Sequence, residues 1–174
     1  MKKSCIIFLL SCILSVTAFS SAGCAQTSMA TDRYLRIHIR ADSNESTAQA
    51  AKYAVRDAVV DYLTPIAASA QDFGQAALLL EQELDALEEV ANAVLRGQGF
   101  DYRAHAALQV EKFPTRKYGE FVLEEGEYLA LILRLGRGKG ENWWCVIYPP
   151  LCFAGQQNIV YKSKILELIE KWKG

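Results

Sequence analysis

The side chains of this sequence that could take part in catalysis, metal binding or redox chemistry are few and widely spaced. The histidines are His38 and His105, and the cysteines beyond the first 24 positions are Cys145 and Cys152. A thioredoxin-like pair needs the spacing CxxC, and a zinc site needs more cysteine or histidine ligands nearby. The motifs GxSxG and HExxH are also absent from the sequence. We therefore predict no catalytic residues, no metal and no cofactor, and a protein that is not an enzyme.

His38 is the histidine with the most distinctive neighbours. It lies between Arg36 and Arg40 in a stretch, Tyr34 to Arg40, where apolar and polar residues alternate. Alternation with a period of two is typical of a strand with one buried face. We therefore expect a solvated histidine on the polar face, where the two arginines disfavour protonation of the imidazole.

Cys145 and Cys152 have two possible structural roles. Outside the cytosol, two remaining cysteines favour a disulfide bond, and Pro149 and Pro150 can turn the chain between them. The alternative is a pair of buried free thiols. Both roles stabilise the fold, and neither predicts a chemical reaction.

A glycine-rich segment, Gly136-Arg137-Gly138-Lys139-Gly140, combines backbone N–H groups with basic side chains. Such a combination can bind anions. A P-loop, however, requires GxxxxGK[ST] at the start of a helix, whereas this segment lies between two predicted strands. The pattern favours a flexible hairpin loop, with a loop that contacts a partner as the alternative.

The aromatic residues that follow are the best candidates for recognition. Trp143 and Trp144 point to opposite sides of an extended segment, and an exposed tryptophan is a common interface anchor. The alternative is that the whole cluster belongs to the core, with the two prolines shaping a turn. The candidate partner-binding residues are Trp143, Trp144, Arg137, Lys139 and Tyr148.

The beginning of the chain is typical of an export signal, which we assign to residues 1–24. Lysines occupy positions 2 and 3, and Cys5 to Phe19 is apolar apart from serine and threonine. This stretch is shorter than the roughly 20 residues that a membrane-spanning helix needs. Small residues follow, so cleavage after Ala22 or Ala25 is expected, with retention as an uncleaved anchor as the alternative.

Cys24 raises the further possibility of lipidation. Small residues precede it, as in bacterial lipoproteins, although Ser21 stands where leucine is usual. A lipid anchor would hold the protein on one membrane face. We expect a short tether at residues 25–31, a domain at 32–154 and a helical tail at 155–174.

Two amphipathic helices are predicted after the first strand. Asp42 and Glu45 form a capping-box pattern that predicts a helix from about Ser43, and Pro65 disfavours its continuation. Asp72 and Gln75 repeat the pattern and predict a second, longer helix that ends near Gly97. Many acidic residues on this second helix indicate a solvated face.

The region beyond these helices predicts strands. Apolar residues alternate around Ala106 to Val110 and Leu129 to Leu135, and Trp144 to Tyr148 supplies a further strand. Turn-prone residues between these runs let adjacent strands pair as antiparallel hairpins. We predict an α+β fold: a mostly antiparallel sheet of about four strands covered by two amphipathic helices, plus a C-terminal helix over Gln157 to Lys173.

Composition excludes several classes of function. The chain has 174 residues, of which 51% are hydrophobic and 22% are charged, and its net charge is −1. These values are typical of one globular domain and lack the basic excess of a nucleic-acid-binding protein. We therefore expect no nucleic-acid partner.

Residues 113–153 contain FPTRKYG, EGEY and GRGKGENWWCVIYPPLCF, and this segment resembles the stage II sporulation protein R family. The run NWWCVIYPPLCF is the most specific part. Upstream, RIHIRADSNE and AAKYAVRDAVV are similar to the opening strand and first helix of the family. The resemblance covers roughly Tyr34 to Ala154.

The resemblance implies a signalling role. A family member is made in the forespore and exported into the space between forespore and mother cell. There it activates, by contact, a septal aspartic protease of the mother-cell membrane, which processes a sigma factor precursor. Two other classes stay open: a structural lipoprotein anchored in the envelope, and an extracytoplasmic hydrolase.

Overall fold

The computed structural model describes residues 33–119 and 121–151. The elements in chain order are β1 (Leu35–Arg40), α2 (Ser46–Ser69), α3 (Phe73–Gln82), α4 (Leu84–Gly97), β2 (Ala104–Phe113), β3 (Arg116–Tyr118), β4 (Phe121–Leu123), β5 (Gly126–Leu135) and β6 (Asn142–Tyr148). The predicted α+β class is confirmed. The predicted C-terminal helix lies outside the described residues.

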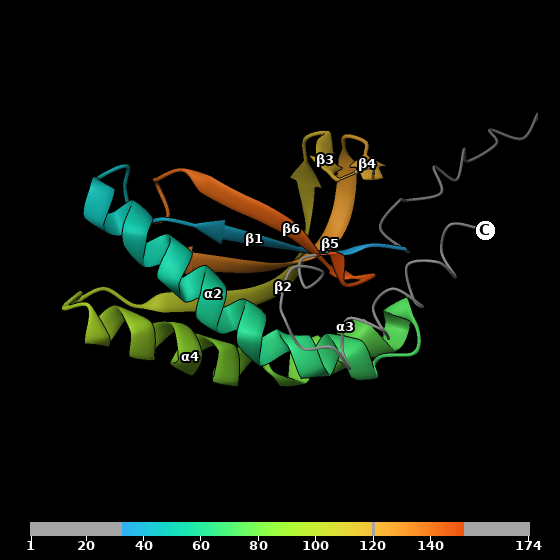
Figure 1. The fold of residues 1–174 in the computed structure, drawn as a ribbon, viewed down its shortest axis with the longest axis horizontal. Coiled ribbons are helices and arrows are strands. Elements are labelled where there is room, and N and C mark those ends of the chain that lie inside the picture. Colours follow the sequence, from blue (N-terminus) through green and yellow to red (C-terminus); the bar gives the residue numbers. More distant parts are fainter. Residues whose placement is uncertain (1–32, 120, 152–174) are drawn as a thin grey trace, which may run out of the picture.

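The four long strands form one sheet in the order β2-β5-β1-β6 (Figure 1). The pairs β2–β5 and β1–β6 are antiparallel, whereas β1 and β5 are parallel. The sheet is therefore mostly antiparallel, as predicted. The prediction that adjacent strands pair as hairpins is wrong for β5 and β6, because β1 inserts between them.

The central position of β1 explains a second difference from the sequence prediction. We expected one buried face, but residues 35–39 of β1 are all buried. Leu35, Ile37 and Ile39 join the core on one face, while Arg36 and His38 are buried on the other. Strand β1 has a neighbouring strand on each side, and both of its faces are covered, so neither face is solvated. The alternating residues therefore point into two different buried environments, one apolar and one polar.

Helices α2 and α4 cover one face of the sheet (Figure 1). Aliphatic residues from these helices and from β1 and β5 form the main core, among them Val55, Val59, Leu87, Leu131 and Leu133. Burial of their apolar surface is the main term that stabilises this layer.

Helix α2 begins later and ends later than the sequence pattern predicts. Asp42, the predicted cap, accepts hydrogen bonds from Arg137 instead of capping the helix. The observed N-cap is Glu45, which makes no side-chain capping bond. The helix also continues through Pro65, which is exposed. Buried residues on both sides of the proline, including Leu63 and Ala67, hold the last turns against the core and outweigh the lost hydrogen bond.

The second predicted helix is divided in two. Asp72 caps α3 as predicted, since its side chain accepts a hydrogen bond from the backbone N–H of Gln75 at 2.8 Å. The helix then stops at Gln82 and α4 starts at Leu84. Glu83, at the break, has a non-helical backbone and accepts a hydrogen bond from the Tyr62 hydroxyl of α2.

The hairpin formed by β3 and β4 was not predicted. It lies between β2 and β5 in sequence and extends away from the helix layer (Figure 1). Its strands have three residues each, which is too short for a periodic pattern. This hairpin contacts the sheet face that the helices leave uncovered, which we call the open face.

Candidate functional site

The strand registers place polar and aromatic side chains in rows across the open face. One row contains His105, Arg134, Arg40 and Asn142, taken from β2, β5, β1 and β6 in turn. The next row contains Ala107, Ile132, His38 and Trp144. Beyond it the face holds Arg36 and Glu111, together with Phe113 and Tyr128. Arg36 and His38 are buried, whereas His105, Arg134 and Asn142 are exposed. The burial of Arg36 is unusual, because charged side chains are rarely fully buried without a charged partner.

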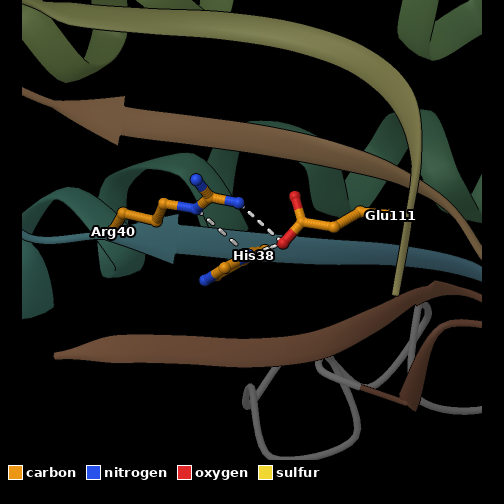
Figure 2. Close-up of polar contacts among 3 residues, drawn as sticks. All are labelled: His38, Arg40 and Glu111. Atoms are coloured by element: carbon orange, nitrogen blue, oxygen red, sulfur yellow. Dashed lines mark hydrogen bonds and ion pairs between the residues drawn. The ribbon is translucent and has the colours of Figure 1, made fainter. Parts of the chain in front are cut away.

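His38, Glu111 and Arg40 form the centre of the open face (Figure 2). The Nδ1 atom of His38 lies 2.8 Å from Oε1 of Glu111, and Nη2 of Arg40 donates to the same oxygen at 2.7 Å. Nε of Arg40 lies 3.5 Å from Nδ1 of His38. The carboxylate is thus held between a cation and an imidazole, and in the neutral ring the bond to Glu111 places the proton on Nδ1.

Burial is the main influence on the charge state of His38. It lowers the pKa of the imidazole below 6.5, and Arg40 acts in the same direction. Asn142 and Glu111 oppose this shift. The predicted lowering of the His38 pKa is confirmed in direction, but its main cause is burial and not the neighbouring arginines. The prediction of a solvated histidine is wrong, because His38 is only 3% exposed.

Arg36 is the most deeply buried charge on this face, with 0% exposure. Its guanidinium carbon lies 4.0 Å from the ring centre of Phe113 and 4.7 Å from that of Tyr128. Nη2 donates to the Tyr118 hydroxyl at 2.8 Å. Nε and Nη1 have no hydrogen-bond partner. Aromatic rings stabilise the charge in part, but two N–H-bearing nitrogens are left without an acceptor.

Arg116 of the β3–β4 hairpin lies over Trp144 on the open face. Its guanidinium carbon is 4.1 Å from the ring centre of Trp144, whose ring in turn lies 5.2 Å from that of His38. The Nε atom of Arg116 is also buried without a partner. The hairpin therefore brings another cation to the open face.

Unsatisfied polar atoms gather on the open face. Six buried side-chain nitrogen or oxygen atoms of the described residues lack a hydrogen-bond partner. Apart from the Tyr102 hydroxyl, all belong to this region: Arg36 Nε and Nη1, His38 Nε2, Glu111 Oε2 and Arg116 Nε. Each such atom costs free energy in a folded protein, so most of the unfavourable polar burial among the described residues lies on the open face.

The two tryptophans lie on opposite sides of β6, as predicted, and both are half-buried. Trp143 packs on the helix side, with the guanidinium carbon of Arg56 at 5.8 Å from its ring centre. Trp144 packs on the open face. Tyr148 is only 1% exposed and belongs to the main core, so its side chain is not available to a partner.

The loop at residues 136–140 connects β5 to β6 across the end of β1, which explains its glycines. The N–H groups of Lys139 and Gly140 donate to backbone oxygens of Asp42 and Ala41. A Cβ at Gly140 would lie 2.2 Å from the backbone oxygen of Ser43. The loop is therefore fixed against the β1–α2 junction, and the prediction of a flexible hairpin loop is wrong.

Arg137 and Lys139 differ in their availability. Arg137 pairs with Asp42, with Nη2 at 2.9 Å from Oδ2, and its hydrogen bonds lower the pKa of the Asp42 carboxyl. Lys139 is exposed. The sequence analysis placed these two residues near the tryptophans, whereas the residues it missed, Glu111 and Arg116, reach the site only through strand pairing and the hairpin.

The remaining candidates concern cysteines. Cys145 is disulfide-bonded. Its predicted partner, Cys152, lies outside the described residues, as does Cys24, so the pairing and the lipidation stay predictions. The export signal also lies outside the described residues.

Within the described ranges, no three His, Cys, Asp or Glu side chains cluster in a way that could hold a metal ion. In the neutral ring, Nδ1–H of His38 donates to Glu111, and Asn142 also interacts with the imidazole. Neither partner is a serine, threonine or cysteine that the imidazole could activate. No helix in the described part is both long and apolar enough to span a membrane.

Comparison with known proteins identifies the family. Residues 31–158 match the family model for stage II sporulation protein R. The chain is 32% identical over 127 residues to the stage II sporulation protein R of Bacillus subtilis (strain 168), which covers 73% of this chain and 57% of that protein. Both descriptions name a sporulation protein, and neither names a catalytic activity.

The alignment thus spans little more than half of the curated relative, and no solved structure matches the chain. The family match nevertheless contains every element of the described fold, from β1 to β6. The open face and the hairpin that contacts it lie within the matched residues. This chain belongs to the stage II sporulation protein R family.

Proposed function

We propose that this sporulation protein is an exported messenger made in the forespore. In the space between forespore and mother cell it binds a septal membrane aspartic protease and favours the active state of that protease. The protease then processes the precursor of a mother-cell sigma factor. The observation that carries the proposal is the family match over residues 31–158.

The geometry agrees with action by contact. Side chains typical of binding hot spots, Trp and Arg, lie along β6 and beside it, with Trp143 and Trp144 both half-buried. This protein can shift the protease toward its active state only if it binds that state more tightly than the inactive one. No covalent step by this protein is required.

Co-expression in a non-sporulating host tests the proposal. The full chain, the protease and the sigma precursor are produced together, and precursor cleavage is followed by immunoblot. We expect cleavage only when all three are present. Equal cleavage without this chain, or none with it, contradicts the proposal.

Two variants locate the contact in the same assay. Trp143→Ala and Trp144→Ala are expected to reduce cleavage, because each removes an aromatic side chain of β6 that could anchor the partner. Leu78→Ala is the matched control, since Leu78 is 61% exposed and belongs to α3 instead of β6. Equal cleavage with the control and both tryptophan variants would place the contact elsewhere.

Cys24→Ala tests the lipid anchor separately. If anchoring is dispensable, the exported variant still triggers cleavage, and the messenger acts as a diffusing domain. If cleavage requires Cys24, the envelope-anchored form is the active one. Metabolic labelling with a fatty acid reports directly whether the cysteine is lipidated.

A further inference from the structure

Arg40 and Arg134 occupy directly paired positions on β1 and β5. Neighbouring strands lie about 4.8 Å apart, and like charges at paired positions destabilise a sheet. Glu111 pairs with Arg40, whereas the exposed side chain of Arg134 makes neither a hydrogen bond nor an ion pair with another described residue. His105 lies on the other side of Arg134. The fold alone gives no reason for this arrangement.

The glycine-rich loop makes room for the two arginines. A Cβ at Gly138 would lie 2.5 Å from Cγ of Arg134 and 3.7 Å from Cβ of Arg40. Gly138 also has a φ of +62°, which favours glycine. The loop therefore packs against the aliphatic stem of Arg134 without crowding it, and this packing favours one placement of the side chain.

Positive charge is concentrated on the open face although the whole chain has a net charge of −1. The four described strands of the sheet place Arg36, Arg40 and Arg134 there, and the hairpin adds Arg116. Glu111 is the one carboxylate that these strands contribute to the same face. An uncompensated excess of arginine attracts anions, above all carboxylates and phosphates.

The surroundings of the two arginines distinguish between these anions. The atoms without hydrogen-bond partners, among them His38 Nε2 and Glu111 Oε2, are buried and do not reach the surface. Trp144 is half-buried on the same face, in the row next to Arg40 and Arg134. The carboxylate of an acidic peptide brings aliphatic atoms that can pack on this ring, whereas a free phosphate has none. The neighbouring aromatic rings add apolar contact area.

We propose that the open face binds an acidic peptide segment of a protein partner, with a carboxylate held between Arg40 and Arg134. The aliphatic part of the segment packs on Trp144. For the identity of the partner this inference rests on the proposed function, because the protease would supply the segment. The binding site itself can be tested without the protease.

The binding test uses the purified full chain and the peptide acetyl-Glu-Glu-Glu-Glu-amide. Shifts of the arginine Nε–H signals in a ¹⁵N–¹H NMR titration report binding. We expect saturable shifts at Arg40 and Arg134, and Arg134→Gln to weaken binding at least about tenfold. The matched control is Arg96→Gln, an exposed arginine on α4, which retains wild-type affinity.

Three results of the titration would overturn the inference. The first is equal binding of acetyl-Gln-Gln-Gln-Gln-amide, which lacks the carboxylates. The second is inorganic phosphate that produces the same shifts with the same affinity, because this would make the face a site for free anions. The third is an equal loss of affinity in the Arg96→Gln control.

The co-expression assay separates the two proposals. Arg134→Glu is expected to abolish precursor cleavage, because it places a carboxylate where the partner's own carboxylate binds. Cleavage by this variant at the wild-type level overturns the inference and leaves the proposed function intact. Absence of cleavage with the wild-type chain overturns the proposed function, and the peptide titration then decides the binding site alone.

Discussion

The helix-covered face of the sheet and its open face differ in what they bury. On the helix side the buried residues are mostly aliphatic. The buried polar side chains of α2 and α4, Lys52, Thr64 and Asn92, each make a hydrogen bond. The open face instead buries Arg36 and His38 among aromatic rings and leaves several of their polar atoms without partners. We infer that the helix-covered face supplies most of the stability. The open face retains polar groups that weaken the fold, and we propose that it serves recognition.

The largest expected effect lies on the helix side. Leu131→Ala removes a fully buried side chain from the main core between β5 and the helices. We expect the free energy of unfolding to fall by about 2 to 5 kcal/mol, because transfer and cavity costs add. Urea unfolding followed by circular dichroism measures the change. A loss below 1 kcal/mol would contradict the assignment of stability to this face.

The next effect concerns the loop that crosses the end of β1. In Gly140→Ala the new methyl group would collide with the Ser43 backbone, so we expect a loss of about 1 to 3 kcal/mol. Gly97→Ala is the control, since a Cβ at this helix terminus meets nothing within 4 Å. Equal stability of the two variants in urea unfolding would show that the loop is not held as described.

A pH dependence on the open face is expected to be smaller. Because burial lowers the folded-state pKa of His38 below 6.5, the unfolded chain binds a proton that the folded chain does not. The free energy of unfolding therefore falls as pH drops from 6.5 toward the folded-state pKa, by at most about 1.4 kcal/mol per pH unit. His38→Gln should remove this slope, and an unchanged slope in the variant would contradict the buried neutral imidazole.

The smallest effect distinguishes the two faces most clearly. Arg36→Met replaces a buried guanidinium that has unpartnered nitrogens with an apolar side chain of similar length. We expect the free energy of unfolding to stay within about 1 kcal/mol of wild type or to rise, because the desolvation cost disappears with the charge. A loss of several kcal/mol would mean that Arg36 stabilises the fold.

Much of the fold was predictable because apolar periodicity reports burial. The alternation in β1, β2 and β5 and the stripe on α2 gave the strands, the helices and the α+β class. The same pattern misled us at His38, since period-two alternation separates two faces without saying whether the polar face is covered. Local breaks such as Glu83, and the passage of α2 through Pro65, depend on tertiary contacts that no local window contains.

The candidate site was predictable only in part. The tryptophans and the glycine-rich loop stood out by composition. Trp144 lies on the open face, whereas Trp143 packs on the helix side. Glu111 and Arg116 did not stand out, because they reach the site through the β2–β5 register and the short hairpin. The sequence signal that could have found the centre of the face was the succession Arg36, His38 and Arg40 on the side of the strand that we expected to be solvated.

The most direct test of the division between the faces is a site-specific photocrosslink in the co-expressing host. A photoreactive amino acid replaces Ala107, exposed on the open face, or Ala93, exposed on α4 in the helix layer. The account predicts a covalent adduct with the protease from position 107 and none from position 93. Adducts from position 93 alone, or equal yields from both positions, would contradict it.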